Sequence, residues 1–223
     1  MTRTQVYWLV ALAIVAASWA VSAIVYPSMP ATVPTHWNIH GKVDGYGAKT
    51  WAMFLMPGAM LGLLAFFKFL PALSPKNFEV DSFRETYLYI MVATTSLFAY
   101  IHVMILVASW RHVAGAAGGD GMGRVLVGGL FLFLALVGNV MGKVKRNFYM
   151  GVRTPWTLAS DRVWNDTHRL AAWFMVGGSL VGFLIAVSGL SLALAFAVLI
   201  VSLLIPVVYS FVHYKQLERR GAV

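Results

Sequence analysis

The sequence predicts an all-α integral membrane protein with about six transmembrane helices in one bundle. Hydrophobic residues make up 60% of the chain and charged residues only 11%, with a mean hydropathy of +0.75. A soluble domain carries about a quarter of charged residues. Since a backbone in lipid must satisfy its own hydrogen bonds, each apolar run of near-spanning length is expected to be a helix. Six such runs lie at about 6–25, 51–70, 86–108, 125–142, 170–188 and 191–212.

The first run is expected to remain in the protein as a helix. Arg3 precedes it, as in a secretory signal, but the run is about as long as a bilayer-spanning segment and longer than the apolar core of a signal peptide. We treat residues 1–223 as a single polytopic membrane domain. Its N-terminal half is 1–110, and its second half is 124–214.

Composition also excludes several kinds of chemistry. The chain contains no cysteine, which excludes disulfides, thiolate catalysis and Cys-based zinc sites. There are 17 Lys and Arg against 8 Asp and Glu, a net charge of +9. In a membrane protein such an excess indicates loops that face anionic lipid, so direct binding of nucleic acid is not expected.

The distribution of basic residues predicts the orientation. With six spans both termini lie on one side, and the other side holds only Lys42, Lys49, Arg111 and Arg124. The positive-inside tendency therefore predicts cytoplasmic termini, in the cytoplasmic (inner) membrane of a bacterium. The thirteen basic residues on the side of the termini are Arg3, Lys68, Lys76, Arg84, Lys143, Lys145, Arg146, Arg153, Arg162, Arg169, Lys215, Arg219 and Arg220.

Glycine and proline suggest how the helices pack. The fifth and sixth runs meet at Gly189 and should form a tight antiparallel pair, and Pro206 should kink the last run. Three pairs of glycines four residues apart would allow close helix contact, although glycine is also simply common in membrane helices. The pairs are Gly58 and Gly62, Gly138 and Gly142, and Gly178 and Gly182.

The outer loop at 27–49 is expected to have a defined shape. Its prolines restrict φ and its glycines permit positive φ, a combination typical of ordered turns. Trp37 and Tyr46 suit the interface between lipid and water.

Histidines in this loop admit two interpretations. His36, His40 and Asp44 are spaced four apart, and His102 in the third run could approach them, which would suit zinc. Alternatively, the loop's polar side chains hydrogen-bond their own backbone, with Asp44 capping a turn. No other cofactor is expected.

The inner loop at 143–169 carries the densest polar chemistry. Thr154 followed by Pro155 predicts a helix start. Trp156 and Trp164 would anchor this short amphipathic helix at the inner interface, in the connection after the fourth span. One interpretation is a lipid-anchored connector, and the other is a binding or signalling surface. In the preceding inner loop, Glu79 or Asp81 either belongs to a solvated linker or pairs with an arginine of the larger loop.

These two loops resemble the motifs of a known family. The inner loop is similar to the signature of the SdpI-like membrane proteins, named for the immunity protein against the sporulation-delaying toxin of bacilli. The outer loop resembles the uncharacterised membrane domain that often forms the N-terminal half of such proteins. The inner motif comprises Asn147, Gly151, Arg153, Thr154, Pro155, Trp156, Thr157, Trp164 and His168, and the outer one Pro34, His36, Trp37, Asn38, Gly41, Asp44 and Lys49.

The resemblance implies a bacterial immunity and signal-transduction protein rather than an enzyme. It implies protection against a secreted toxic peptide and sequestration of a cytoplasmic ArsR-like repressor. In the predicted orientation the outer motif would meet the peptide and the inner motif would hold the repressor. A metal-dependent membrane hydrolase is the enzymatic alternative, but the predicted spans contain no acidic residue to serve beside a metal. A small-solute transporter is the third class, although the spans lack clustered ionisable residues.

Overall fold

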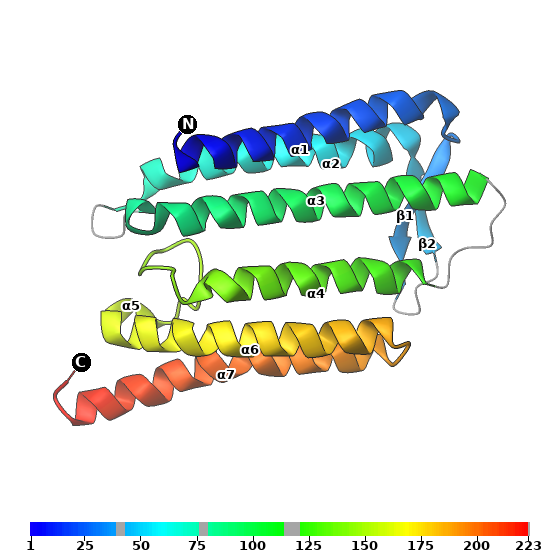
Figure 1. Ribbon diagram of the computed structural model, residues 1–223. Helices are drawn as coiled ribbons and strands as arrows, with labels where there is room; N and C mark the ends of the chain where they lie inside the picture. Colours follow the sequence, from blue (N-terminus) through cyan, green and yellow to red (C-terminus); the bar gives the residue numbers. More distant parts are fainter. Residues whose placement is uncertain (39–42, 76–79, 114–120, 223) are drawn as a thin grey trace.

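A computed structural model describes residues 1–38, 43–75, 80–113 and 121–222. Within these residues, six helices are long and apolar enough to cross a membrane, which confirms the predicted multi-pass class. Both termini lie at one end of the bundle, here called the termini end, and a β-hairpin lies at the opposite, hairpin end (Figure 1). The six helices are α1 (Arg3–Val25), α2 (Lys49–Phe69), α3 (Arg84–Val113), α4 (Met122–Met141), α6 (Asp161–Val187) and α7 (Leu192–Arg219).

Shorter elements complete the fold. In the described part of the N-terminal half, three 3₁₀ turns flank the helices, at Tyr26–Ser28, Leu70–Leu73 and Val80–Phe83. The five-residue helix α5 (Pro155–Ala159) precedes α6 at the termini end. Helix α1 begins at a capping box in which the Thr2 hydroxyl accepts from the backbone N–H of Gln5.

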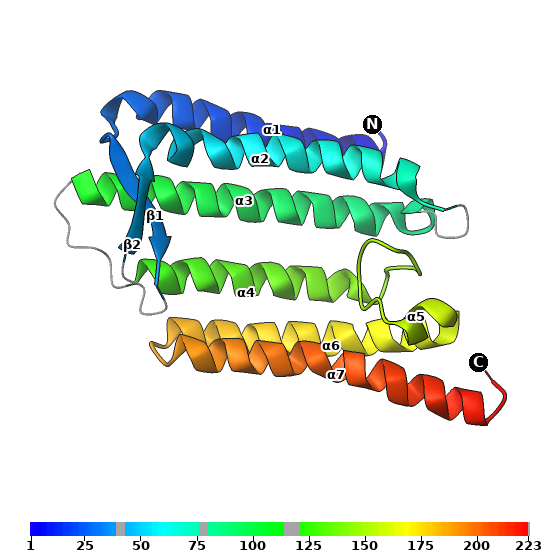
Figure 2. The ribbon, with the colours of Figure 1, turned by 180° about the vertical axis from the view of Figure 1, so that it is seen from behind.

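The outer loop contains a β-hairpin that the sequence did not lead us to expect. Strands β1 (Thr32–Trp37) and β2 (Val43–Ala48) pair antiparallel, with register irregularities on either side of His36. Val33 on β1 is fully buried and packs with α2 and α3, so the hairpin is docked on the helices rather than standing above them (Figure 2). Short two-stranded sheets are marginal alone, and this packing stabilises the hairpin.

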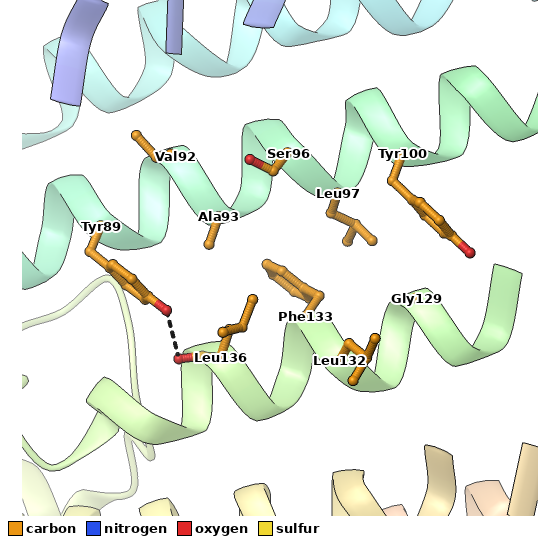
Figure 3. Close-up of a pocket in the computed structure, with 10 residues that line it drawn as sticks. All are labelled: Tyr89, Val92, Ala93, Ser96, Leu97, Tyr100, Gly129, Leu132, Phe133 and Leu136. Atoms are coloured by element: carbon orange, nitrogen blue, oxygen red, sulfur yellow. Dashed lines mark hydrogen bonds between the residues drawn. The ribbon is translucent and has the colours of Figure 1, made fainter. Parts of the chain in front are cut away.

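The helices form two groups that meet at one seam. Helices α1, α2 and α3 pack together, α6 packs on both α4 and α7, and α3 contacts α4 between the groups (Figure 1). Along the seam, the Tyr100 hydroxyl donates to the Val125 carbonyl at 2.5 Å and the Tyr89 hydroxyl reaches the Leu136 carbonyl at 3.5 Å. Figure 3 shows the facing side chains, which line a cavity of about 380 Å³. The two groups therefore meet at a seam that contains a cavity, although one buried core cluster spans both groups.

Two of the three glycine pairs contact another helix. A Cβ at Gly138 would lie 3.1 Å from Met175 on α6, and one at Gly178 would lie 2.2 Å from the Ser202 hydroxyl on α7. Gly58 and Gly62 have nothing within 4 Å of the same position. Of the three pairs, the two that allow close helix approach therefore lie in the second group of helices, and the interpretation of the Gly58 pair as a contact was wrong.

A polar junction joins α1, α2 and α3 inside the bundle. Pro57 lacks an N–H, so the carbonyl of Met53 loses its helical partner. Ser22 on α1 donates its hydroxyl to that carbonyl at 2.7 Å. Nε2 of His102 lies 2.8 Å from the same Ser22 oxygen, and it must be the donor because the serine proton is already committed. The Ser22 hydroxyl thus replaces the N–H donor that Pro57 lacks, and the buried His102 donates to that hydroxyl.

Candidate functional site

The inner-loop residues form a compact structure at the termini end, organised by Asn147. Its side chain is fully buried and makes four hydrogen bonds to the backbone of its own loop. The Nδ2 group donates to the carbonyls of Lys145 and Met150 at 2.8 and 3.2 Å. Oδ1 accepts from the N–H groups of Tyr149 and Met150 at 2.7 and 2.8 Å. The Asn147 side-chain amide therefore provides hydrogen-bond partners for two carbonyls and two N–H groups of the loop backbone.

His168 ties this loop to α6. The N–H of Val152 donates to Nε2 at 2.9 Å, and Nδ1 lies 2.8 Å from the carbonyl of Trp164. A backbone N–H only donates and a carbonyl only accepts, so the ring is neutral with its proton on Nδ1. Gly151 has φ +105°, and a Cβ there would lie 2.2 Å from Nε2. Only glycine provides both the backbone angle and the space that this contact needs.

Thr154 and Thr157 form the predicted start of α5. Each threonine hydroxyl accepts from the backbone N–H of the other, at 3.2 and 2.9 Å. The Thr157 hydroxyl also donates to the carbonyl of Val152 at 2.7 Å, and the Thr154 hydroxyl lies 3.0 Å from that of Ser210 on α7. The helix start predicted at Thr154 and Pro155 is confirmed, and it also fastens the loop to the last helix.

The predicted amphipathic helix is shorter than expected. It ends at Ala159, because Ser160 is extended, and a new helix starts at Asp161. Trp164 therefore falls in the first turns of α6, where it is 0% exposed and donates from Nε1 to the Val144 carbonyl at 2.7 Å. The expectation that Trp164 anchors in lipid was wrong, because the break at Ser160 turns it toward the core. Trp156 is half-buried and contacts Phe211, with ring centroids 4.9 Å apart.

Charged residues form further contacts on the surface of the same loop and the helices beside it. Arg146 donates to the Leu158 carbonyl at 2.8 Å and pairs with Asp161 at 2.8 Å. Asp166 on α6 accepts from Arg169 at 2.8 Å and lies 3.0 Å from Nε2 of His213. These contacts cross between the loop, α6 and α7, so the termini end is bonded across all three.

Few of the predicted inner-loop residues are exposed on the protein surface. Asn147, Thr157, Trp164 and His168 are buried, whereas Arg153 and Pro155 are exposed. Arg153 also donates to the carbonyl of Phe148. The motif therefore mainly builds the loop and leaves a small surface exposed around Arg153.

Asp81 in the preceding connection has a local partner. It pairs with Arg84 at 2.5 Å, three residues away. This local pair favours the linker interpretation for Asp81 over the alternative of a pairing with an arginine of the larger loop, since its carboxylate is met within the turn that starts α3. Glu79, the other candidate, lies outside the described residues.

At the hairpin end the outer-loop residues lie on both strands. His36 and Asp44 face each other, with Nδ1 and Oδ1 2.5 Å apart. Lys49 folds back, with Nζ 3.4 Å from the carbonyls of Tyr26 and Met29 and 4.4 Å from the Tyr26 ring centroid. Pro34 is buried on β1, whose last residue is Trp37, and Asn38 follows it. His40 and Gly41 lie outside the described residues.

The described residues do not assemble the proposed zinc ligands. His36 meets Asp44, but no group of three His, Cys, Asp or Glu lies together in the described ranges. His102 instead bonds Ser22 within the bundle. The fully buried His102 is thus used in a contact between helices. His40 lies outside the described residues, so the zinc site stays a prediction.

Several residues at these sites were not predicted from the sequence. Ser210 and Ser22 are ordinary small residues in apolar runs, and only their neighbours in space reveal their roles. Pro57 was a usable signal, because a proline within a spanning helix frees the carbonyl four residues earlier. Arg146 carried no signal beyond its charge.

Comparison with known proteins agrees with the resemblance seen in the motifs. Residues 143–210 match the SdpI/YfhL protein family, and residues 13–61 match a domain of unknown function, DUF1648. The chain is 26% identical over 216 residues to the protein named Immunity protein SdpI of Bacillus subtilis (strain 168), covering 94% of this chain and 97% of that protein. No solved structure matches the chain.

Proposed function

We propose that this chain, whose residues 143–210 belong to the SdpI/YfhL protein family, is a membrane immunity protein that binds a secreted toxic peptide. The similarity to an immunity protein over 94% of the chain carries the proposal. A likeness of that length takes in both the hairpin end and the termini end. The proposed protein acts by binding and signalling and not as an enzyme.

The proposed orientation puts the hairpin outside and both termini in the cytoplasm of a bacterium. Thirteen of the 17 basic residues belong to the side of the termini in the sequence, which the positive-inside tendency assigns to the cytoplasm. A secreted peptide would then meet the hairpin end first. The excess of basic residues on one side is typical of proteins of the cytoplasmic membrane, so the proposal puts the chain in that membrane.

In this proposal the hairpin is the sensing end. Its docking on α2 and α3 couples the strands to the helices, so that a peptide bound at β1 would press on the bundle. The exposed pair of His36 and Asp44 offers polar groups to the peptide. Pro34, Trp37, Asn38, Gly41 and Lys49 are proposed as the remaining outer residues.

The termini end is the proposed signalling end, where an ArsR-like repressor would be held. The exposed surface around Arg153 and Pro155 would contact the repressor. Trp156 borders this surface, and the buried members of the motif would act by shaping it. Gly151 and His168 keep the loop on α6, so any shift of α6 would move Arg153.

Protection of a sensitive bacterium tests the proposal. Cells that express the chain should survive purified sporulation-delaying toxin, and a reporter-tagged ArsR-like repressor should move to their membranes when toxin is added. Absence of both protection and recruitment would overturn the proposal. An empty vector and a chain lacking residues 143–223 provide the baselines.

Two point variants separate the two ends. Asp44→Asn removes the charge beside His36 and should weaken protection. Arg153→Gln removes an exposed cation and should reduce recruitment of the repressor while protection remains. Equal loss of both readouts in both variants would contradict the division into a sensing end and a signalling end.

A further inference from the structure

A second cavity lies between the two groups of helices at the hairpin end. It measures about 500 Å³, which falls within the range of small-ligand sites. Leu126 and Leu130 of α4 and Phe196 of α7 contribute to its walls, and α2 and α3 add further apolar side chains. The space is therefore apolar on the sides that face into the bundle.

The hairpin supplies the polar end of this cavity. Thr35 and His36 of β1, with Asn38 just after it, are the hairpin residues that line it. These side chains offer a hydroxyl, an imidazole and an amide. Among the described residues that line the cavity there is no Lys or Arg, so a phosphate would find no cation there.

The cavity also brings together the two matched segments of the chain. Met56 and the hairpin residues belong to the segment 13–61, and Phe196 belongs to 143–210. The seam of α3 and α4 contributes to this cavity and also carries the cavity of Figure 3, and Leu97 lines both. A molecule seated here would touch both segments at once.

We propose that this cavity binds bulky apolar side chains of the toxic peptide, with the peptide backbone at the hairpin. This inference rests on the proposed function. A peptide fits better than a lipid, because the hydroxyl of Thr35 and the amide of Asn38 suit a peptide backbone, and the described lining holds no Lys or Arg for a phosphate. Among the described residues, each strand of the two-stranded sheet is also paired on one side only, which leaves edges where an extended segment can add.

Narrowing the cavity tests this inference. Leu126→Trp adds a large ring at the cavity wall, whereas Val125→Trp adds the same ring at the neighbouring position, which is 49% exposed. Binding of purified sporulation-delaying toxin is measured with each full-length protein in lipid nanodiscs. We expect Leu126→Trp to weaken binding by about tenfold or more, as when a central contact is lost, and Val125→Trp to bind as the unchanged chain does.

Leu130→Phe is a second, smaller enlargement for the case that Leu126→Trp does not fold, as judged by size-exclusion chromatography and unfolding temperature. Unchanged binding in the folded cavity variants would overturn the inference, since apolar side chains of the peptide would then lie elsewhere or a lipid chain would fill the space. The unchanged chain would still bind and protect, so the proposed function would stand. Failure of the unchanged chain both to bind and to protect would overturn both.

Discussion

The backbone N–H of Val152 donates to Nε2 of His168 at 2.9 Å, which joins the loop after α4 to the first turns of α6. The opposite ring nitrogen lies 2.8 Å from the Trp164 carbonyl, and the imidazole stacks on the Trp164 ring with centroids 4.0 Å apart. Both ring nitrogens of His168 thus have hydrogen-bond partners, and one face of the ring is covered by Trp164. His168 therefore acts as a positioning residue for the loop.

Replacing His168 should loosen this loop. His168→Leu leaves the Val152 N–H without its acceptor, a loss of about 1 kcal/mol for a donor that is part-buried. His168→Gln can return an oxygen to the Nε2 position and should lose less. Unfolding in detergent gives the stability, and hydrogen exchange at Val152 gives the local effect. Equal exchange rates in both variants would show that this bond does not hold the loop.

Gly151 should tolerate alanine much less well than Gly189 does. Both glycines have positive φ, at +105° and +86°, so alanine strains the backbone at each by about 1–3 kcal/mol. Only at Gly151 would the new Cβ also meet His168, at 2.2 Å. Gly151→Ala should therefore lower the unfolding temperature more than Gly189→Ala. A similar drop in both would mean that strain alone decides.

Ser22 and Pro57 should be energetically coupled across α1 and α2. Ser22→Ala leaves the Met53 carbonyl without a donor, with a loss of about 1–2 kcal/mol for an interhelical hydrogen bond in a membrane. Pro57→Ala restores an N–H that can bond the same carbonyl within α2. The loss from Ser22→Ala should then shrink in the Pro57→Ala background.

A double-mutant cycle on unfolding free energies measures this coupling. Ser18→Ala is a matched control, because the Ser18 hydroxyl donates to the Ile14 carbonyl within its own helix. Its effect should be the same with either residue at position 57. An additive cycle for Ser22 and Pro57 would contradict the role assigned to the serine hydroxyl.

The proposed orientation predicts which thiols can be labelled from outside the cell. The natural chain has no cysteine, so single substitutions report without background. Tyr46→Cys on β2, at a position 57% exposed, should react with a membrane-impermeant maleimide in intact cells. Gln216→Cys near the end of α7 should react only after permeabilisation. The reverse pattern would invert the orientation and with it the assignment of the two ends.

Features that depend on composition or on residues close together in the sequence could be predicted. Spans appear in composition alone, because a bilayer requires long apolar helices. The start of α5 at Thr154 and Pro155 was also readable, since a helix start uses residues close in sequence. The prediction for Trp164 was wrong, because the extended residue Ser160 breaks the helix and Trp164 belongs to α6, where it is buried.

Composition and apolar runs were enough to predict a multi-pass helical membrane protein, and the two loop motifs were enough to reveal the resemblance to the SdpI-like proteins. These properties depend on local composition and on residues near one another in the chain. The three-dimensional structure was needed to see that the outer loop is a hairpin docked on α2 and α3, that His168 bonds the Val152 N–H, and that Ser22 donates to the carbonyl freed by Pro57. Each of these depends on which groups meet across helices, and a hydrogen bond between distant residues leaves no mark in either stretch of sequence alone.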